Sequence, residues 1–316
     1  MTSFALSLGS ALVAFSPTLS LLLLFAYKKA QLVIIVTTAS FFHLLACLLA
    51  ALLHLPFKSL GLGVQNIFII VPTSVIAQSI ARCAFVHGYH KVESVIEKSI
   101  QKHEEQNNSS ESDQGGVSET EQLKLELNDT ASGIAAGVGY AFFHTVMLYG
   151  TLLASENSRM GTLYQDSCTF MPSIFNSALM AFMFGILDIV WMLLTFYGMR
   201  RYNEFKEGNG AGRRGSSPSR NEPVSARGST DFDWSFQINH LGGKMALAIM
   251  VVTHFAAAFA TLPNQTFALN GCVVALPSLA FVTIVTCAIF WFYCKKNYLP
   301  QGQQQRIRLA TSRHVD

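Results

Sequence analysis

The stretch Ser132–Gly150, SGIAAGVGYAFFHTVMLYG, decides the fold of this chain. It carries no formal charge, follows a long polar segment, and has small residues crowded into its first half. Gly133, Gly137 and Ala141 follow one another at four-residue intervals, so a helix places them on one face. His144 returns to that face. Because a face without side chains lets another helix approach closely, and close approach drives helix association in lipid, we predict a packing groove with one polar group in it.

The composition of the whole chain is that of a membrane protein. Of its 316 residues, 51% are hydrophobic and 13% are charged, whereas soluble domains carry roughly 25% charged residues. A net charge of +3, dispersed along the chain, argues against nucleic-acid binding. Six cysteines without CxxC spacing indicate neither a metal site nor a disulfide framework.

The apolar residues form seven blocks, and each can supply the roughly 20 residues that a membrane-spanning helix needs. We therefore predict an all-α membrane protein with seven transmembrane helices. No internal repeat relates the blocks, so the sequence gives no support to a transporter of the inverted-repeat type. The predicted spans lie near Ser3–Ala26, Gln31–His54, Val64–Val86, Ala131–Ala154, Phe170–Gly198, Lys244–Leu262 and Asn270–Cys294.

Two polar segments interrupt this series of spans. They are rich in Ser, Gly, Asn and charged residues, which cannot bury a core, so we predict that both are disordered cytosolic loops. The third helix is expected to continue into water as HGYHKVESVIEKSIQK. The chain then divides into spans 1–3 in 1–98, a loop in 99–130, spans 4–5 in 131–199, a basic loop in 200–243, spans 6–7 in 244–294 and a tail in 295–316.

Basic residues gather at alternate ends of the predicted spans. They follow the first span as Lys28 and Lys29 and recur in the second polar loop and in the tail. Because Lys and Arg are retained on the cytosolic side, we predict an N-terminus in the lumen or outside and a C-terminus in the cytosol. The loops of the opposite side carry few such residues: one each in 55–63 and 155–169 and none in 263–269.

Two cysteines, Cys168 and Cys272, fall on the predicted luminal side, near the starts of the fifth and seventh spans. An oxidising compartment permits a disulfide between them. Whether the bond forms depends on the distance between the two Cα atoms, which the sequence alone leaves open.

Two ionisable residues lie in the middle of predicted spans, where such residues are expensive and usually face protein or water. Asp188 lies twelve residues before Arg200, or about 18 Å of helix. His254 lies ten residues after Lys244, or about 15 Å. If both basic residues mark the cytosolic interface, Asp188 and His254 have similar depths and antiparallel helices could pair them. The pair fits a structural role, and an Asp–His pair also suits proton relay or catalysis.

Further polar residues lie in the second, third and fourth spans. Gln78 and Arg82 are one turn apart on one face of the third span. Arg82 is low enough to extend its side chain to the cytosolic interface, or else it bonds a buried helix end or a partner subunit. His43 stands isolated in the second span. His144 is the better functional candidate because it shares the small-residue face of the fourth.

The motifs of known membrane proteases and nucleotide-binding enzymes are absent from the sequence. An intramembrane aspartyl protease needs two aspartates, whereas the predicted spans contain only Asp188. We find no HExxH zinc motif, no GxSx serine setting, and no Rossmann or P-loop glycine pattern. The sequence therefore predicts that the chain is not an enzyme by itself.

Several blocks, taken in order, resemble one family, the anterior-pharynx-defective (Aph) subunits of γ-secretase. LVAFSPTLSLLLLFAY and QLVIIVTTASFFHLLACLLA resemble its first two spans. Gln78 and Arg82 match a glutamine and arginine pair in its third, and SGIAAGVGYA matches the glycine series of its fourth. VVTHFAAAFATLPN keeps a histidine and an asparagine, His254 and Asn264, and the seventh block keeps LP at 276–277.

The chain departs from the family pattern at two positions. The third glycine of the family series is Ala141 here, which keeps a close approach but loosens it slightly. The family has a histidine in the fifth span where this sequence has Asp188, and the family's histidine pair is implicated in assembly and activity of the complex. A carboxylate at this position would allow a charged His254 to be paired.

The resemblance implies a non-catalytic scaffold subunit. Such subunits assemble with nicastrin and then hold presenilin, which supplies both catalytic aspartates, and the presenilin enhancer subunit. The complex cleaves type I membrane proteins, including Notch-like receptors, and the expected locations are the endoplasmic reticulum, Golgi, endosomes and plasma membrane. Membrane lipids surround such a chain, and neither a cofactor nor nucleic acid is implied. The groove on Ser132–Gly150 would receive a helix of a partner subunit or an internal helix.

Two other functions fit seven spans with an outside N-terminus. A seven-helix receptor has the same topology, although no DRY-like triplet ends the third span and no NPxxY lies in the seventh. A small-solute transporter could be built around Asp188 and His254. Coupling to a G protein and solute flux, respectively, distinguish these alternatives from a scaffold.

Overall fold

Long apolar helices account for most of the chain in the computed structural model, which describes residues 4–59, 67–107, 129–157, 164–211, 234–264 and 271–294. Seven helical segments of these described residues are long and apolar enough to cross a membrane. This finding confirms the predicted all-α fold with seven transmembrane helices. The segments are Phe4–Ala26, Ala30–Phe57, Phe68–Ile96, Asp129–Ser155, Ser173–Asn203, Gly242–Asn264 and Gly271–Phe292.

The helices follow from the sequence because a helix satisfies its own backbone hydrogen bonds, which lipid cannot do. The first spans are α1 (Phe4–Leu21) with a π-helical turn (Leu22–Ala26), α2 (Ala30–Ser59) and α3 (Ile67–Asn107). The fourth consists of α5 (Asp129–Thr145), a π-helical turn (Val146–Gly150) and α6 (Thr151–Asn157). After an antiparallel hairpin of β1 (Tyr164–Gln165) and β2 (Cys168–Pro172) come α7 (Ser173–Ala211), α8 (Trp234–Ala260), a 3-10 turn (Leu262–Asn264) and α9 (Gly271–Cys294).

The described helices differ from the predicted boundaries in two respects. The fifth span was expected to begin at Phe170, but that residue lies in β2 and α7 begins only after Pro172. The pairing of β2 with β1 gives Phe170 an extended backbone, and α7 begins directly after this hairpin. In addition, α7 continues beyond residue 200, where the second polar loop was expected to begin. The helix α3 continues through HGYHKVESVIEKSIQK, as predicted, and ends at Asn107. The remainders of the two polar loops, 108–128 and 212–233, and the tail lie outside the described residues.

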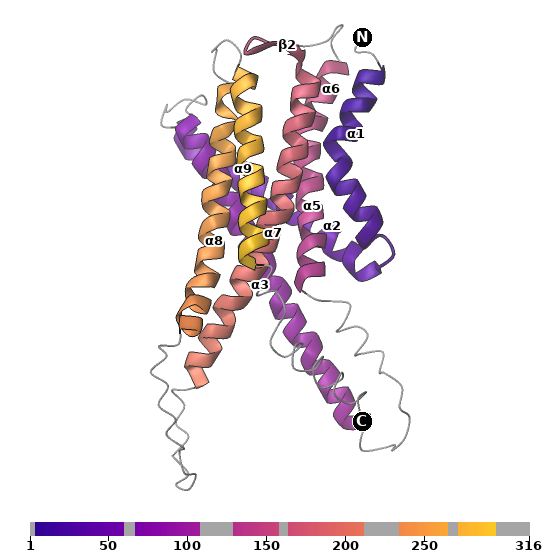
Figure 1. Cartoon of the computed structure of the whole chain (residues 1–316). Coiled ribbons are helices and arrows are strands. Elements are labelled where there is room, and N and C mark those ends of the chain that lie inside the picture. The colour runs from indigo at the N-terminus through magenta and orange to yellow at the C-terminus, as the bar shows by residue number, and fades with distance from the viewer. Residues whose placement is uncertain are drawn as a thin grey trace.

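The centre of the bundle is α7 (Figure 1). It contacts α1 and α5 on one side and α8 and α9 on the other. All residues from Trp191 to Gly198 are buried, which agrees with a segment that is apolar on every face. One core cluster joins α2, α3, α5 and α7 around Phe196, and a second joins α7, α8 and α9 around Trp191. The central helix thus brings residues of both clusters close together.

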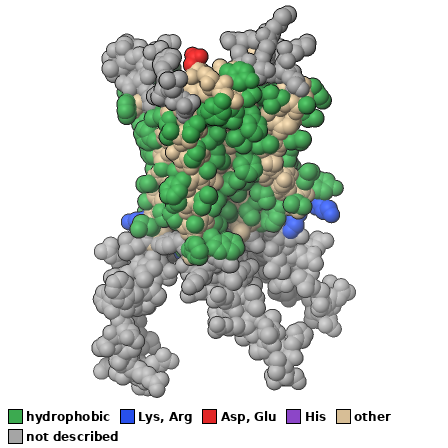
Figure 2. Space-filling view, turned by 45° about the horizontal axis from the view of Figure 1, so that its top comes forward, with side chains coloured by type: hydrophobic (Ala, Val, Ile, Leu, Met, Phe, Trp, Pro, Cys, Tyr) green, Lys and Arg blue, Asp and Glu red, His purple; other side chains and the backbone are tan. Residues whose placement is uncertain are grey.

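The outer surface of the bundle is predominantly apolar. Leu24 on the turn after α1 and Phe281 on α9 expose 84% and 68% of their surface. Figure 2 shows hydrophobic side chains covering the bundle, with the visible Lys and Arg side chains at its lower margin. Such a surface is stable in a bilayer and not in water, because large exposed apolar areas otherwise associate. The chain is therefore an integral, multi-pass membrane protein.

A disulfide closes one end of the bundle. Cys168 at the start of β2 and Cys272 at the start of α9 are bonded, with their Cα atoms 5.6 Å apart. The bond fixes the hairpin between α6 and α7 to the beginning of the last span. The sequence left this pairing open, and the structure shows it.

Candidate functional site

The small-residue face of α5 is filled by helices of the same chain. A Cβ atom on Gly137 would lie 2.7 Å from the Cα atom of Ile189 in α7. A Cβ atom on Gly139 would collide with the backbone oxygen of Val36 in α2. These two glycines therefore place α5 in backbone contact with α7 on one side and α2 on the other. Because backbone cannot move aside as a flexible side chain can, both close approaches require glycine.

The predicted groove is thus an internal packing surface in this structure. Of the two occupants expected for it, a partner-subunit helix or an internal helix, the internal helix α7 lies against Gly133 and Gly137. Gly133 is the less demanding position, since its Cβ would meet the Cδ2 atom of Leu193, a flexible side chain, at 2.9 Å. Ala141 is completely buried. Gly139 was not singled out from the sequence because it lies outside the four-residue series.

Four ionisable side chains from four helices meet next to this packing surface. We call Arg82 of α3, His144 of α5, Asp188 of α7 and His254 of α8 the polar cluster. The Arg82 Nη2 atom donates a hydrogen bond to Asp188 Oδ1. His144 Nδ1 lies 2.7 Å from Asp188 Oδ2, and Arg82 Nη1 lies 3.2 Å from His254 Nδ1. One carboxylate and one guanidinium therefore link all four helices.

The direct pairing expected between Asp188 and His254 does not form. The two residues do lie at the same level of the bundle, as their calculated depths predicted, but the Arg82 guanidinium lies between them and bonds both. Arg82 is fully buried, so the prediction that its side chain extends to the cytosolic interface is wrong. Asp188 supplies a counter-charge inside the bundle, which removes the need for the guanidinium to reach water.

Aromatic rings complete the surroundings of the Arg82 guanidinium. Its Cζ atom lies 5.2 Å from the ring centroid of Tyr140 and 5.2 Å from that of Trp191. Trp191 also stacks on His254, with ring centroids 4.2 Å apart, and donates a hydrogen bond from Nε1 to Thr253 Oγ1 at 2.8 Å. Cation–π contact is worth most in a desolvated site such as this one. Neither Trp191 nor Tyr140 was predicted from the sequence as part of a site, because an aromatic residue in an apolar span carries no local signal of a charged neighbour.

His43 of α2 lies beside the polar cluster rather than isolated as the sequence suggested. Its ring centroid is 5.3 Å from that of His144 and 5.3 Å from that of Tyr140. Its Nδ1 atom is buried without a hydrogen-bond partner among the described residues. The fifth helix around this site is thus α2, and His43 packs edge-on against Tyr140.

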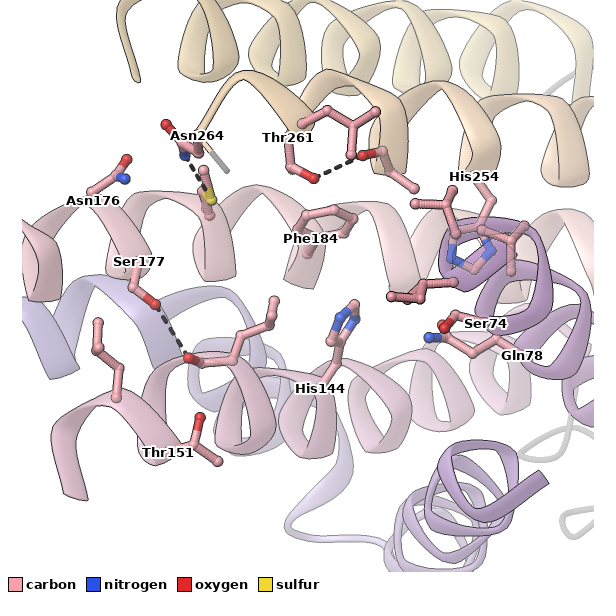
Figure 3. A pocket seen from close by; sticks show the side chains of 18 of the residues that line it. Ser74, Gln78, His144, Thr151, Asn176, Ser177, Phe184, His254, Thr261 and Asn264 are labelled. Carbon is pink, nitrogen blue, oxygen red and sulfur yellow. Dashed lines mark hydrogen bonds between the residues drawn. The ribbon is translucent and has the colours of Figure 1, made fainter. Parts of the chain in front are cut away.

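A cavity of about 620 Å³ opens beside the polar cluster between α3, α5, α7 and α8. Figure 3 shows Asn176 and Asn264 at one end of it and Gln78 and His254 at the other, with His144 between them. The side-chain oxygens of Gln78, Asn176 and Asn264 are buried without a partner among the described residues. The cavity therefore presents hydrogen-bond acceptors. The sequence predicted four of its polar residues, and the fold brings them together.

A second group of charged residues, separate from the polar cluster, also joins α3, α5 and α7. Arg200 Nη2 donates to the Glu93 carboxylate at 2.7 Å and to Asp129 Oδ1 at 2.6 Å. His90, Glu93 and Asp129 are close enough together to ligate a metal ion. Both carboxylates, however, are already bonded to Arg200, so an ion would have to displace the guanidinium. Sequence reasoning treated Arg200 only as a marker of the membrane interface.

Comparison with known proteins adds to this geometry. A family model described as Aph-1 protein matches residues 5–208. The chain belongs to the Aph-1 family. The matched residues run from α1 into α7 and include Arg82, His144 and Asp188. This confirms the family that the order of the sequence blocks resembled.

A curated relative extends the likeness of this Aph-1 family member to its whole length. The protein named gamma-secretase subunit APH1-like, from Arabidopsis thaliana, is 24% identical over 311 residues, which cover 98% of this chain and 99% of the relative. The similarity therefore includes α8 and α9, which lie beyond the residues that the family model matches.

Proposed function

We propose that this chain is a non-catalytic scaffold subunit of a γ-secretase-like intramembrane aspartyl protease complex. It supports assembly and stability of presenilin and nicastrin, also contacts the presenilin enhancer subunit, and so permits cleavage of type I membrane proteins. Membership of the Aph-1 family and the name of the Arabidopsis relative support this proposal. The expected locations are the endoplasmic reticulum, Golgi, endosomes and plasma membrane.

The observation that carries the scaffold role is the bonding of Asp188. Both of its carboxylate oxygens are bonded, one to Arg82 and one to His144. Aspartyl protease chemistry needs two carboxyl groups that share a proton. The other described aspartates are Asp129, at the start of α5, and Asp166, in the hairpin. Asp188 lies in the middle of α7, so neither of them is beside it. An arrangement that uses its buried carboxylate to hold helices together favours a structural role over a catalytic one.

The proposed orientation places the hairpin and the disulfide in the lumen or outside the cell. Disulfides persist in oxidising compartments, so the Cys168–Cys272 bond supports this assignment. The distribution of Lys and Arg supports it independently. Arg200, Glu93 and Asp129 would then lie near the cytosolic surface.

Affinity purification of the full chain in mild detergent, followed by mass spectrometry, tests the proposed function. Homologues of presenilin and nicastrin should co-purify in near-stoichiometric amounts. A second multi-pass protein carrying the same tag serves as the control for non-specific capture. Recovery of the folded chain without presenilin or nicastrin would overturn the proposal.

The cavity favours one alternative, a small-solute transporter. Its volume of about 620 Å³ and its polar residues fit a small ligand. A transporter should produce solute flux in proteoliposomes that contain this chain alone. A scaffold should produce none and should still recover presenilin in the purification.

A further inference from the structure

The last turns of the apolar span of α3 carry an exposed apolar stripe. Val92 and Val95 each expose 58% of their surface, and Ile96 exposes 41%. Figure 1 shows this part of α3 leaving the bundle obliquely, so that it is separated from the other spans. Exposed apolar residues on a solvated helix are unfavourable unless another surface covers them.

A row of lysines runs beside the apolar stripe. Lys91, Lys98 and Lys102 are all exposed, and at 100° per residue they fall within about 40° of one another around the helix. Val95, Val92 and Ile96 occupy about the next 100° of the circumference. The helix therefore has an apolar face with a cationic edge, which is the pattern of helices that lie at a membrane surface.

Another side of the helix is held to the bundle. Glu93 lies on a different side of the helix and bonds Arg200 of α7 at 2.7 Å. This ion pair joins α3 to the end of the central helix. The apolar stripe and the lysine row are consequently turned toward neither α7 nor the polar cluster.

The length of the apolar span places this segment at the headgroups. The span Phe68–Ile96 has 29 residues, or about 43 Å of helix, whereas the hydrocarbon core is about 30 Å thick. Even on the oblique path seen in Figure 1, its last turns reach the headgroup layer. The lysine row begins there and continues beyond it, where an ammonium group can meet a phosphate while the valines and Ile96 contact acyl chains.

We propose that residues 91–102 of α3 form a docking surface for the anionic phospholipid headgroups of the protein's own membrane. The apolar stripe contacts the acyl-chain boundary, and the lysine row binds the phosphates. In the proposed orientation this surface lies on the cytosolic leaflet, which is the anionic one. The inference rests on exposure and charge in α3 and does not depend on the proposed scaffold role.

Two serines provide a matched pair of reporter positions. Ser99 lies in the middle of the apolar stripe, and Ser94 lies about 140° away from it. Both are exposed, and both hydroxyls donate to carbonyl oxygens of their own helix, at 3.0 Å and 2.8 Å. The full chain, with Cys47, Cys83, Cys287 and Cys294 changed to alanine, is labelled with a fluorophore through Ser99→Cys or Ser94→Cys. It is then reconstituted into vesicles containing brominated lipid, which quenches a fluorophore near the acyl chains.

The proposal predicts that the label at residue 99 is quenched, and the label at residue 94 is not. Quenching at residue 99 should be stronger in an equimolar mixture of phosphatidylserine and phosphatidylcholine than in phosphatidylcholine alone. Each lysine near an anionic surface strengthens the attraction about fivefold, so Lys98→Gln/Lys102→Gln should weaken docking about 25-fold. The matched control Lys28→Gln/Lys29→Gln, which also removes two charges, should leave quenching at residue 99 unchanged.

Three outcomes would overturn the proposal. The first is equal quenching at both positions, and the second is quenching that does not depend on phosphatidylserine or on Lys98 and Lys102. The third is docking of the helix to an acidic protein, seen as protection of residue 99 that requires an added protein and occurs without anionic lipid. Monodisperse elution of every variant ensures that a change reflects docking and not misfolding.

Discussion

Arg82 and Asp188 offset the free-energy cost that each charge has when it is buried inside a membrane protein. An isolated guanidinium or carboxylate in an apolar interior is strongly disfavoured. Here the Arg82–Asp188 ion pair neutralises both charges, and two histidines bond the second carboxylate oxygen and the Nη1 atom. The Arg82 Nε atom is buried without a hydrogen-bond partner among the described residues. The pair stabilises less than its Coulomb attraction suggests because desolvation opposes it, but each charge is needed once the other is present.

Removal of one charge should therefore be severe at this position. Arg82→Gln removes the guanidinium from the buried Asp188 carboxylate, which keeps only its contact with His144, and should destabilise the fold by about 3–5 kcal/mol. The matched control is Arg200→Gln, because the Arg200 side chain is 37% exposed and solvent screens its ion pairs. That change should cost at most about 1 kcal/mol. Thermal unfolding in detergent, followed by circular dichroism, measures both.

The double variant Arg82→Gln/Asp188→Asn separates lost charge pairing from lost volume. Because two amides can hydrogen-bond one another without an unpaired charge, the double variant should be more stable than either single variant. Additive losses in the double variant would show that the two residues act independently and would contradict the bonding described for the polar cluster.

At the scale of the element, α5 depends on two glycines that face different neighbours. Gly137 allows α7 to approach, and Gly139 allows α2 to approach. The helix α5 therefore lies between α7 and α2 and allows both to pack closely against its backbone. Its position also fixes His144 beside Asp188.

Gly137→Leu tests this role of α5. The new side chain would have to separate two backbones, so we expect loss of folded, monodisperse protein and, with it, loss of presenilin from the purified complex. The matched control is Gly9→Leu on α1, where an added Cβ meets nothing within 4 Å. Normal yield and normal presenilin recovery for Gly137→Leu would refute the described contact.

The disulfide between β2 and α9 is the second element-scale feature with a measurable effect. Cys168 and Cys272 are 104 residues apart in the sequence, so their bond restricts the unfolded chain substantially. Cys168→Ala/Cys272→Ala should lower stability by about 2–5 kcal/mol. The control Cys47→Ala/Cys287→Ala removes two free thiols and should change stability much less. Thermal unfolding with and without reductant measures the difference, and equal sensitivity of both variants to reductant would contradict it.

At the scale of the whole molecule, the ends of the bundle differ in chemistry. The disulfide and the hairpin lie at one end, and Arg200 with its two carboxylate partners lies toward the other. This asymmetry is what the proposed orientation requires, because oxidising chemistry and retained basic residues belong to opposite sides of a membrane.

Epitope tags at the two termini test the orientation. In cells whose plasma membrane alone has been permeabilised, an antibody should reach a tag after Asp316 and should not reach a luminal tag before Met1. Full permeabilisation should expose both tags and serves as the control. Access to the N-terminal tag on membranes inside the cell under the selective condition would reverse the proposed topology; a tag on molecules at the plasma membrane is extracellular and is not counted.

Local sequence patterns were enough to predict the seven spans, the small-residue face of α5 and four of the polar residues that line the cavity. Hydropathy and helical periodicity are local properties, and lipid leaves a long apolar segment little choice but a helix. Only the tertiary structure decided that α7 and α2 occupy the face of α5, that Gly139 matters as much as Gly137, and that Arg82 rather than His254 bonds Asp188. These outcomes depend on which helices become neighbours. Arg82 and Asp188 are 106 positions apart, and no local pattern encodes the packing that joins them.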